Sequence, residues 1–279
     1  MNTTKHRLRN AGGRTLNVTE WSGNGPACLM LHGFGEGAFV WDRFVPLAAP
    51  FCRLFAADLR GHGYSDWDIE RNYRITDYES DILLIIERLA LRRLTLIGHS
   101  LGGKIAIRIA ARKAGDIRGL IVVDYGPDVS ELAVSRIRAD FARQLRVYTS
   151  PTDYATLLRD QRPMMADSTI EEIASIALRE RANGGYELKC DPALLNYPSG
   201  GSERSDMWFA LGQITCPTLV LRGVASSVLR HDVAQRMANV LPMGRFITVP
   251  RAGHSVMLDN AADFGNIALD FLKSVWLVQ

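Results

Sequence analysis

Ser100 is the residue whose surroundings most strongly suggest chemistry. It lies in the pentapeptide Gly98–Gly102, which reads Gly-His-Ser-Leu-Gly. The apolar run Leu94–Ile97 precedes this pentapeptide, and the helix-forming run Lys104–Ala110 follows it. A Gly-x-Ser-x-Gly sequence in this context is typical of a sharp strand-to-helix turn that exposes the serine hydroxyl, with glycines permitting close packing. The sequence therefore predicts that Ser100 is a nucleophile.

A serine that transfers acyl groups needs backbone N–H groups that stabilise the developing negative charge. Leu101 follows the nucleophile directly at the expected helix start and supplies one candidate donor. The loop 32–36 follows an earlier apolar strand, and there the N–H of Phe34 is the second candidate. An ordinary tight turn would also explain His32-Gly33, and we expect a structural role for His32.

A histidine must act as the general base for the serine. Among the six histidines, His254 follows the last predicted strand, in the sequence Val-Pro-Arg-Ala-Gly-His. Open α/β sheets bind ligands at the carboxyl ends of their strands, and this position places His254 there. We therefore predict His254 as the base.

Short apolar runs alternate with helical segments along the chain, which predicts an α/β fold with a mostly parallel sheet flanked by helices. The predicted strands are Thr15–Trp21, Ala27–His32, Arg53–Asp58, Leu94–Gly98, Leu120–Asp124, Thr218–Arg222 and Arg245–Val249. The predicted helices are Thr76–Leu89, Leu101–Ala114, Asp232–Leu241 and Ala261–Val275.

The alternation is interrupted between residues 127 and 206. This segment contains helix formers without a strand-like run, and turn sequences such as Ser150-Pro151 and Tyr197–Gly201 divide it. We expect a helical cap at 127–206, inserted into a core formed by residues 1–126 and 207–279.

These motifs resemble those of the α/β-hydrolase superfamily over nearly the whole chain. The resemblance rests on the loop 32–35 (His-Gly-Phe-Gly), on residues 58–65 (Asp-Leu-Arg-Gly-His-Gly-Tyr-Ser), on the Ser100 pentapeptide and on Gly253-His254. It implies the α/β-hydrolase fold and a Ser-His-acid triad. It does not fix the reaction, because esterases, amidases, lactonases, carbon–carbon bond hydrolases and haloperoxidases share these motifs.

The position of the acid departs from the common pattern of the superfamily. Most members carry it in the loop after the penultimate strand, but here residues 223–229 contain no carboxylate. Asp232 lies further on, at the start of a predicted helix, where acidic residues usually act as helix caps. Asp124 ends the predicted strand that follows the Ser100 helix, at the same sheet edge as Ser100 and His254. We favour Asp124 as the triad acid, although Asp before Gly-Pro is also common in plain turns.

An acid in this position, together with the Arg-Gly-x-x-Ser-Ser sequence at 222–227, is similar to (E)-2-(acetamidomethylene)succinate hydrolases. The acid placement is also similar to that of N-formylmaleamate deformylases, and both resemblances imply cleavage of amides in small dicarboxylates. Ring-cleaving dioxygenases without a cofactor share the placement as well. The sequence predicts a hydrolase of an ester or amide bond, and leaves as alternatives a carbon–carbon bond or enol-lactone hydrolase, such a dioxygenase, and a noncatalytic receptor.

The partner is expected to be a small molecule. Four residues near the predicted sheet edge or in the cap region are candidate substrate contacts: His99, Tyr125, Arg162 and Trp208. Arginines of the cap could clamp a carboxylate, but they alternate with acidic residues, so ion pairs on a solvated surface explain most of them.

Composition narrows the function classes further. The formal charge is +3, and hydrophobic residues make up 47% of the chain and charged residues 23%. Without a run of like charges or a basic stripe, neither nucleic acid nor a membrane is an expected partner. The four cysteines are widely spaced, so we predict buried reduced thiols rather than a zinc site, and neither a metal nor an organic cofactor. A cytoplasmic monomer or homodimer is expected.

Overall fold

The computed structural model describes residues 2–113, 115–196 and 203–277, and within them an eight-stranded sheet forms the centre of the molecule. The strands are β1 Thr3–Arg9, β2 Thr15–Trp21, β3 Ala27–Leu31, β4 Arg53–Ala57, β5 Leu94–His99, β6 Ile117–Val123, β9 Thr218–Gly223 and β10 Gly244–Val249. Their order is β1-β2-β4-β3-β5-β6-β9-β10. The pairs β1/β2 and β2/β4 are antiparallel, and all later neighbours are parallel.

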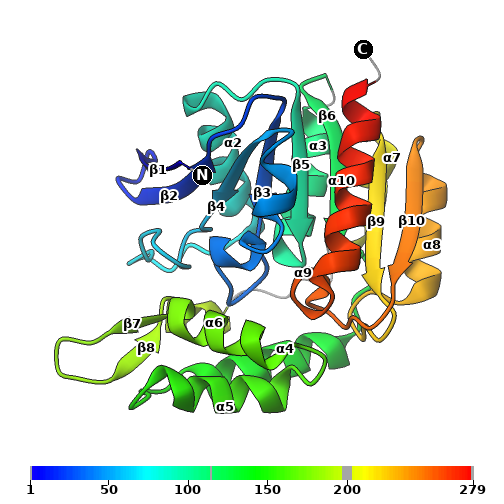
Figure 1. Cartoon of the computed structure of the whole chain (residues 1–279). Helices are drawn as coiled ribbons and strands as arrows, with labels where there is room; N and C mark the ends of the chain where they lie inside the picture. The colour runs from blue at the N-terminus through cyan, green and yellow to red at the C-terminus, as the bar shows by residue number, and fades with distance from the viewer. Residues whose placement is uncertain (1, 114, 197–202, 278–279) are drawn as a thin grey trace.

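Helices cover both faces of this sheet. Figure 1 shows α10 (Ala261–Leu277) in front of the strands, and behind them α2 Ile75–Arg88, α3 Leu101–Arg112, α7 Glu203–Gly212 and α8 His231–Val240. The short α1 (Val45–Ala48) packs beside α10. Every residue of β3 and β5 is buried, which explains why these strands read as continuous apolar runs. No helix in the described part of the chain is long and apolar enough to cross a membrane.

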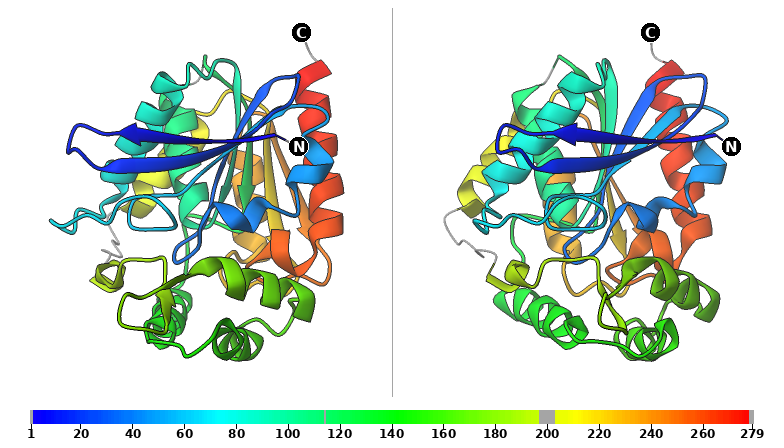
Figure 2. Two further views of the ribbon diagram at one scale, coloured as in Figure 1. Left: turned by 60° about the vertical axis from the view of Figure 1, so that its left-hand side comes forward. Right: turned by 90° about the vertical axis from the view of Figure 1, so that its left-hand side faces the viewer.

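A separate layer lies across the carboxyl edge of the sheet (Figures 1 and 2). It contains α4 Glu131–Gln144, α5 Pro151–Gln161, α6 Asp167–Ala177 and a hairpin of β7 Leu178–Glu180 with β8 Tyr186–Leu188. Ser130 and Ser150 begin α4 and α5 by accepting hydrogen bonds from the backbone N–H three residues on. We call this layer, residues 131–188, the cap.

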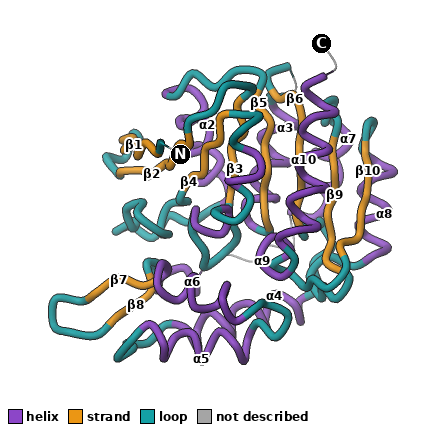
Figure 3. Tube along the Cα trace, in the orientation of Figure 1, coloured by secondary structure: helices purple, strands orange, loops and turns teal. Residues whose placement is uncertain are grey.

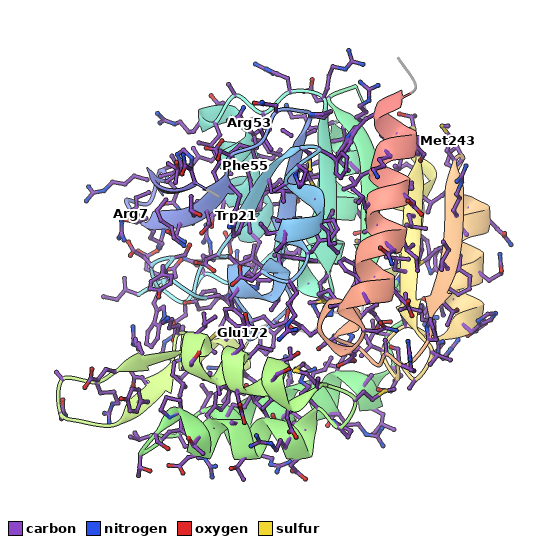
Figure 4. All side chains as sticks on the ribbon, in the orientation of Figure 1. Arg7, Trp21, Arg53, Phe55, Glu172 and Met243 are labelled. Atoms are coloured by element: carbon purple, nitrogen blue, oxygen red, sulfur yellow. The ribbon has the colours of Figure 1, made fainter. Side chains whose placement is uncertain are left out.

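Contacts between aromatic and charged side chains fix the cap on the core. Phe141 of α4 packs edge-to-face on Phe34, with ring centroids 4.8 Å apart. Glu172 of α6, labelled in Figure 4, accepts a hydrogen bond of 2.8 Å from Arg43 of the core. These contacts hold the cap over the loops that follow β3.

The structure differs from the sequence prediction at β1, in the cap and at α7, and it contains the short helix α1, which was not predicted. Thr3–Arg9 forms edge strand β1, whose polar, exposed residues show no apolar alternation. The cap is not wholly helical, because the three-residue strands β7 and β8 form the hairpin visible in Figure 3. Helix α7 spans the boundary predicted between residues 206 and 207 and packs on α3 and α8, so it belongs with the core. The predicted turn Tyr197–Gly201 lies outside the described residues.

Candidate active site

Ser100 occupies the tight turn between β5 and α3. Its backbone adopts φ 50° and ψ −113°, and such sparsely populated conformations cost on the order of 1–3 kcal/mol. The flanking glycines make this turn possible. A Cβ at Gly98 would lie 2.3 Å from the carbonyl oxygen of Gly102, and a Cβ at Gly102 would lie 2.2 Å from that of Leu31. The Gly-x-Ser-x-Gly pattern therefore has a steric cause in this fold.

Three side chains from distant parts of the chain form a hydrogen-bonded row at the carboxyl edge of the sheet. His254 Nε2 lies 3.1 Å from Ser100 Oγ, and His254 Nδ1 lies 2.7 Å from Asp124 Oδ2. The Asp124 side chain is fully buried, whereas that of His254 retains 18% exposure. Burial lowers the pKa of His254 below its ordinary value of 6.5, His99 and Arg162 act in the same direction, and Asp124 opposes them.

The loop after β9 supplies hydrogen-bond donors to Asp124 instead of an acid of its own. Ser226 Oγ donates to Asp124 Oδ2 at 2.5 Å, and the N–H of Gly223 donates to Oδ1 at 3.2 Å. Asp232, the alternative acid, is exposed on α8 and pairs with Arg230 at 2.7 Å. The geometry thus brings Asp124, and not Asp232, to His254.

The loop after β3 passes next to Ser100. Phe34 lines the same cavity as Ser100 and His254, while Leu101 is buried as the first residue of α3. The N–H of Gly35 donates to His62 Nε2 at 3.1 Å, which anchors the loop. Both predicted N–H donors therefore come from backbone segments adjacent to the serine.

Two buried histidines have structural positions beneath this loop. His32 Nδ1 donates to the carbonyl of Gly33 at 2.7 Å, and its Nε2 accepts the N–H of Leu59 at 2.9 Å. His62 makes the equivalent pair of bonds to Arg60 and Gly35. Burial lowers the pKa of His32 to about 4 and that of His62 to about 3, so both are neutral. The predicted structural role of His32 agrees with these contacts.

A cavity of about 320 Å³ lies between the row of side chains and the cap. Phe141 and Ile137 of α4 and Met164 after α5 give it apolar walls. Arg162 also lines it and donates from Nη1 to Ser255 Oγ at 2.8 Å. The volume is within the range of small-molecule sites, and the lining combines these apolar side chains with charged ones, among them Arg136, Arg162, Glu36 and Asp259.

The other three predicted substrate contacts lie elsewhere or have other partners. Trp208 of α7 donates its indole N–H to Asp128 at 3.0 Å and stacks under Arg236, and it is not among the residues that line the cavity. Tyr125 is likewise absent from the described lining and packs against Gly103 of α3. His99 borders the cavity, but protein acceptors occupy both of its ring nitrogens. Of these three residues, only His99 therefore lines the cavity.

Ser226 and Glu36 are the two site residues whose roles were not predicted. Glu36 accepts the N–H of Gly33 at 2.8 Å and lies 2.9 Å from His99 Nδ1. For Ser226 the sequence offered a partial signal, the Ser-Ser pair in the loop without a carboxylate. Glu36 gave none, because its partner His99 is 63 positions away in the chain.

Comparison with known proteins shows the family of this chain. The sequence matches the model of the alpha/beta hydrolase family over residues 28–266. The chain belongs to this family. Its relatives include 2-(acetamidomethylene)succinate hydrolase of Mesorhizobium japonicum, with 28% identity over 87% of this chain and 86% of the relative. Fluoroacetate dehalogenase of a Burkholderia species is 34% identical over 96% of this chain and 94% of the relative.

Solved structures of alpha/beta hydrolases superpose closely on the chain. The crystal structure of E-2-(acetamidomethylene)succinate hydrolase gives a TM-score of 0.88 with 25% identity, covering 98% of this chain and all of the other. The N-formylmaleamic acid deformylase of Pseudomonas putida S16 gives a TM-score of 0.70 with 20% identity over 96% and 100% of the two chains. The relatives include amide hydrolases and esterases, so this alpha/beta hydrolase is an enzyme of the hydrolase class.

Proposed function

We propose that this alpha/beta hydrolase cleaves an ester or amide bond of a small metabolite through an acyl-enzyme on Ser100. The observation that carries the proposal is the continuous row of hydrogen bonds from Asp124 through His254 to Ser100, in which His254 and Ser100 line the cavity. In this row Ser100 is the nucleophile, His254 the general base and Asp124 the acid that orients it.

In the first half-reaction, Ser100 Oγ attacks the carbonyl carbon of the substrate while His254 Nε2 takes the hydroxyl proton. The oxyanion that forms accepts hydrogen bonds from the N–H groups of Phe34 and Leu101. His254, now an imidazolium stabilised by Asp124, then gives its proton to the leaving alcohol or amine. The carbon–oxygen or carbon–nitrogen bond breaks, and the acyl group remains on Ser100.

In the second half-reaction, water replaces the leaving group in the cavity. His254 removes a proton from the water as its oxygen attacks the acyl carbon, and the same N–H groups hold the second oxyanion. Collapse of this intermediate returns the proton to Ser100 Oγ and releases the carboxylic acid. The lowered pKa of His254 keeps it neutral and able to act as a base near pH 7.

Arg162 suggests the class of substrate. Arg162 lines the cavity together with Ser100. A carboxylate on the substrate could pair with this guanidinium while the bond to be cleaved rests on Ser100. The relative named 2-(acetamidomethylene)succinate hydrolase, whose substrate name combines an acetamido group with the dicarboxylate succinate, supports the same substrate class here.

A fluorophosphonate probe tests the proposal, because it phosphonylates an activated serine. We expect the wild-type protein to be labelled on the peptide that contains Ser100, and Ser100→Ala to lose the label. Ser227→Ala is the matched control: Ser227 also lines the cavity but is exposed, so its variant should label like the wild type. A wild-type protein that stays unlabelled, or a label that persists in Ser100→Ala, would overturn the proposal and favour a noncatalytic receptor.

A further inference from the structure

His99, the residue before the nucleophile, has an unusual pair of hydrogen-bond partners. Its Nδ1 lies 2.9 Å from Glu36 Oε2, and its Nε2 lies 2.9 Å from the backbone carbonyl oxygen of His254. The His99 side chain is 1% exposed and that of Glu36 is 11% exposed. Water therefore has little access to either group, and the protein must satisfy both ring nitrogens.

The number of protons on His99 follows from these partners. A neutral imidazole has one N–H donor and one acceptor nitrogen, whereas a carbonyl oxygen and a carboxylate can only accept. Both ring nitrogens of His99 must then carry a proton. Glu36 fits the ionised form, because its Oε2 also accepts the N–H of Gly33 at 2.8 Å.

The electrostatics of the pair point the same way. Burial by itself would raise the pKa of Glu36, but the charge and hydrogen bond of His99, the charge of Arg162 and the Gly33 N–H hold this pKa well below its ordinary range. Burial would lower the pKa of His99, yet the Glu36 carboxylate outweighs burial and raises it.

We propose that Glu36 and His99 form a permanently charged ion pair next to the Ser100 turn, which positions His254 and places a fixed positive charge beside it. His99 and Glu36 are positioning residues here, since they act through His254 and through the loop after β3. The charge on His99 does not depend on the proposed function. The effect of this charge on catalysis does rest on the proposed function.

The pair connects two loops of the site whose relative position must stay fixed. Through the His254 carbonyl it holds the loop that carries the base, and through the Gly33 N–H it holds the loop that carries Phe34. The approach is close: a Cβ at Gly33 would lie 2.7 Å from His99 Nδ1 and 2.8 Å from Glu36 Oε2. A side chain at position 33 would therefore displace His99 or Glu36 from its place in the pair.

The pair also affects the basicity of His254. The rings of His99 and His254 are 4.7 Å apart, so a cation on His99 disfavours a second cation on His254 and contributes to its lowered pKa. The other charged or titratable groups that act on these two histidines come from four segments: His32 after β3, Asp124 after β6, Arg162 at the end of α5 and Asp259 of α9 (Val256–Asp259).

Nitrogen NMR of the protein with ¹⁵N-labelled histidine tests the charge directly and needs no substrate. We expect both ring nitrogens of His99 to be protonated at pH 7.5 in the wild type, while the neutral rings of His32 and His62 serve as internal references. In Glu36→Gln, we expect His99 to carry one ring proton. The signals are assigned by comparison with a His99→Asn spectrum. A singly protonated His99 in the wild type at pH 7.5 would overturn the proposal.

The pH profile of kcat/KM tests the effect on His254. Glu36→Gln retains a polar group next to His99 but removes the anion, so the cation is lost and the acid limb should move up by about one pH unit. Glu172→Gln, which removes the carboxylate of an ion pair at the cap boundary, is the control and should keep the wild-type profile. If the pH profile of Glu36→Gln is unshifted while Ser100→Ala is inactive, the inference is refuted and the proposed function stands. If Ser100→Ala is active, the proposed function is refuted.

Discussion

Replacing Ser226 by alanine removes the shortest hydrogen bond that Asp124 receives, 2.5 Å from a side chain that is 8% exposed. A hydrogen bond to a charged group is worth about 1.5–3 kcal/mol in folding. The variant also takes away the acceptor for the N–H groups of Val228 and Leu229, which adds to the loss. We therefore expect the free energy of unfolding to fall by about 2–4 kcal/mol, and the melting temperature by roughly 4–10 °C.

The same substitution should weaken catalysis, because Asp124 loses one of the two donors that orient it toward His254. A loss of about 1.4 kcal/mol of transition-state stabilisation corresponds to a roughly tenfold lower kcat/KM. Thermal unfolding and ester hydrolysis of Ser226→Ala and Ser227→Ala measure both effects with a neighbouring serine as control. If the two variants behave alike in stability and rate, the reasoning about the loop after β9 is refuted.

Three further predictions concern the base, the acid and the substrate. Asp124→Asn should lower kcat by about 10⁴-fold, as loss of the orienting carboxylate does in serine hydrolases. The kcat of Asp232→Asn should stay near that of the wild type, and comparable losses in both variants would contradict Asp124 as the triad acid. The acid limb of kcat/KM should have its midpoint below pH 6.5, since activity needs neutral His254 and its pKa is lowered; a midpoint above pH 7 would count against this. Arg162→Gln should raise KM for carboxylate-bearing esters about tenfold or more and leave the KM for neutral esters unchanged. Arg159→Gln on the cap surface is the control. An equal effect of Arg162→Gln on both substrate types would exclude the carboxylate contact.

The parallel core could be predicted because burial on both faces gives local, continuous apolar runs. β2 matches its predicted bounds, Thr15–Trp21, and the other predicted strands agree within three residues. The turn at Ser100 could also be predicted, since its sequence and its flanking elements lie within 20 residues. Asp124 could be predicted as the acid by elimination, because the loop after the penultimate strand, residues 223–229, lacks a carboxylate.

The remaining features depend on contacts between distant residues, which a local pattern does not record. Glu36 meets His99, and Ser226 meets Asp124 across 102 positions, only because β3, β5, β6 and β9 are neighbours in the sheet. Trp208 has an aromatic ring near the predicted cap in sequence, but packing of α7 on α3 turns it to Asp128. The hairpin of β7 and β8 is too short to show an alternating pattern.

The most direct test of the central claim is the hydrolysis rate of wild type and Ser100→Ala on a panel of activated esters and N-acyl enamides. The mechanism predicts hydrolysis by the wild type and a loss on the order of 10⁶-fold in kcat for the variant, as in other triad hydrolases that lose their serine. Folding of the variant can be verified from its unchanged melting profile. A folded Ser100→Ala protein that keeps the wild-type rate would contradict the claim that Ser100 carries the acyl group.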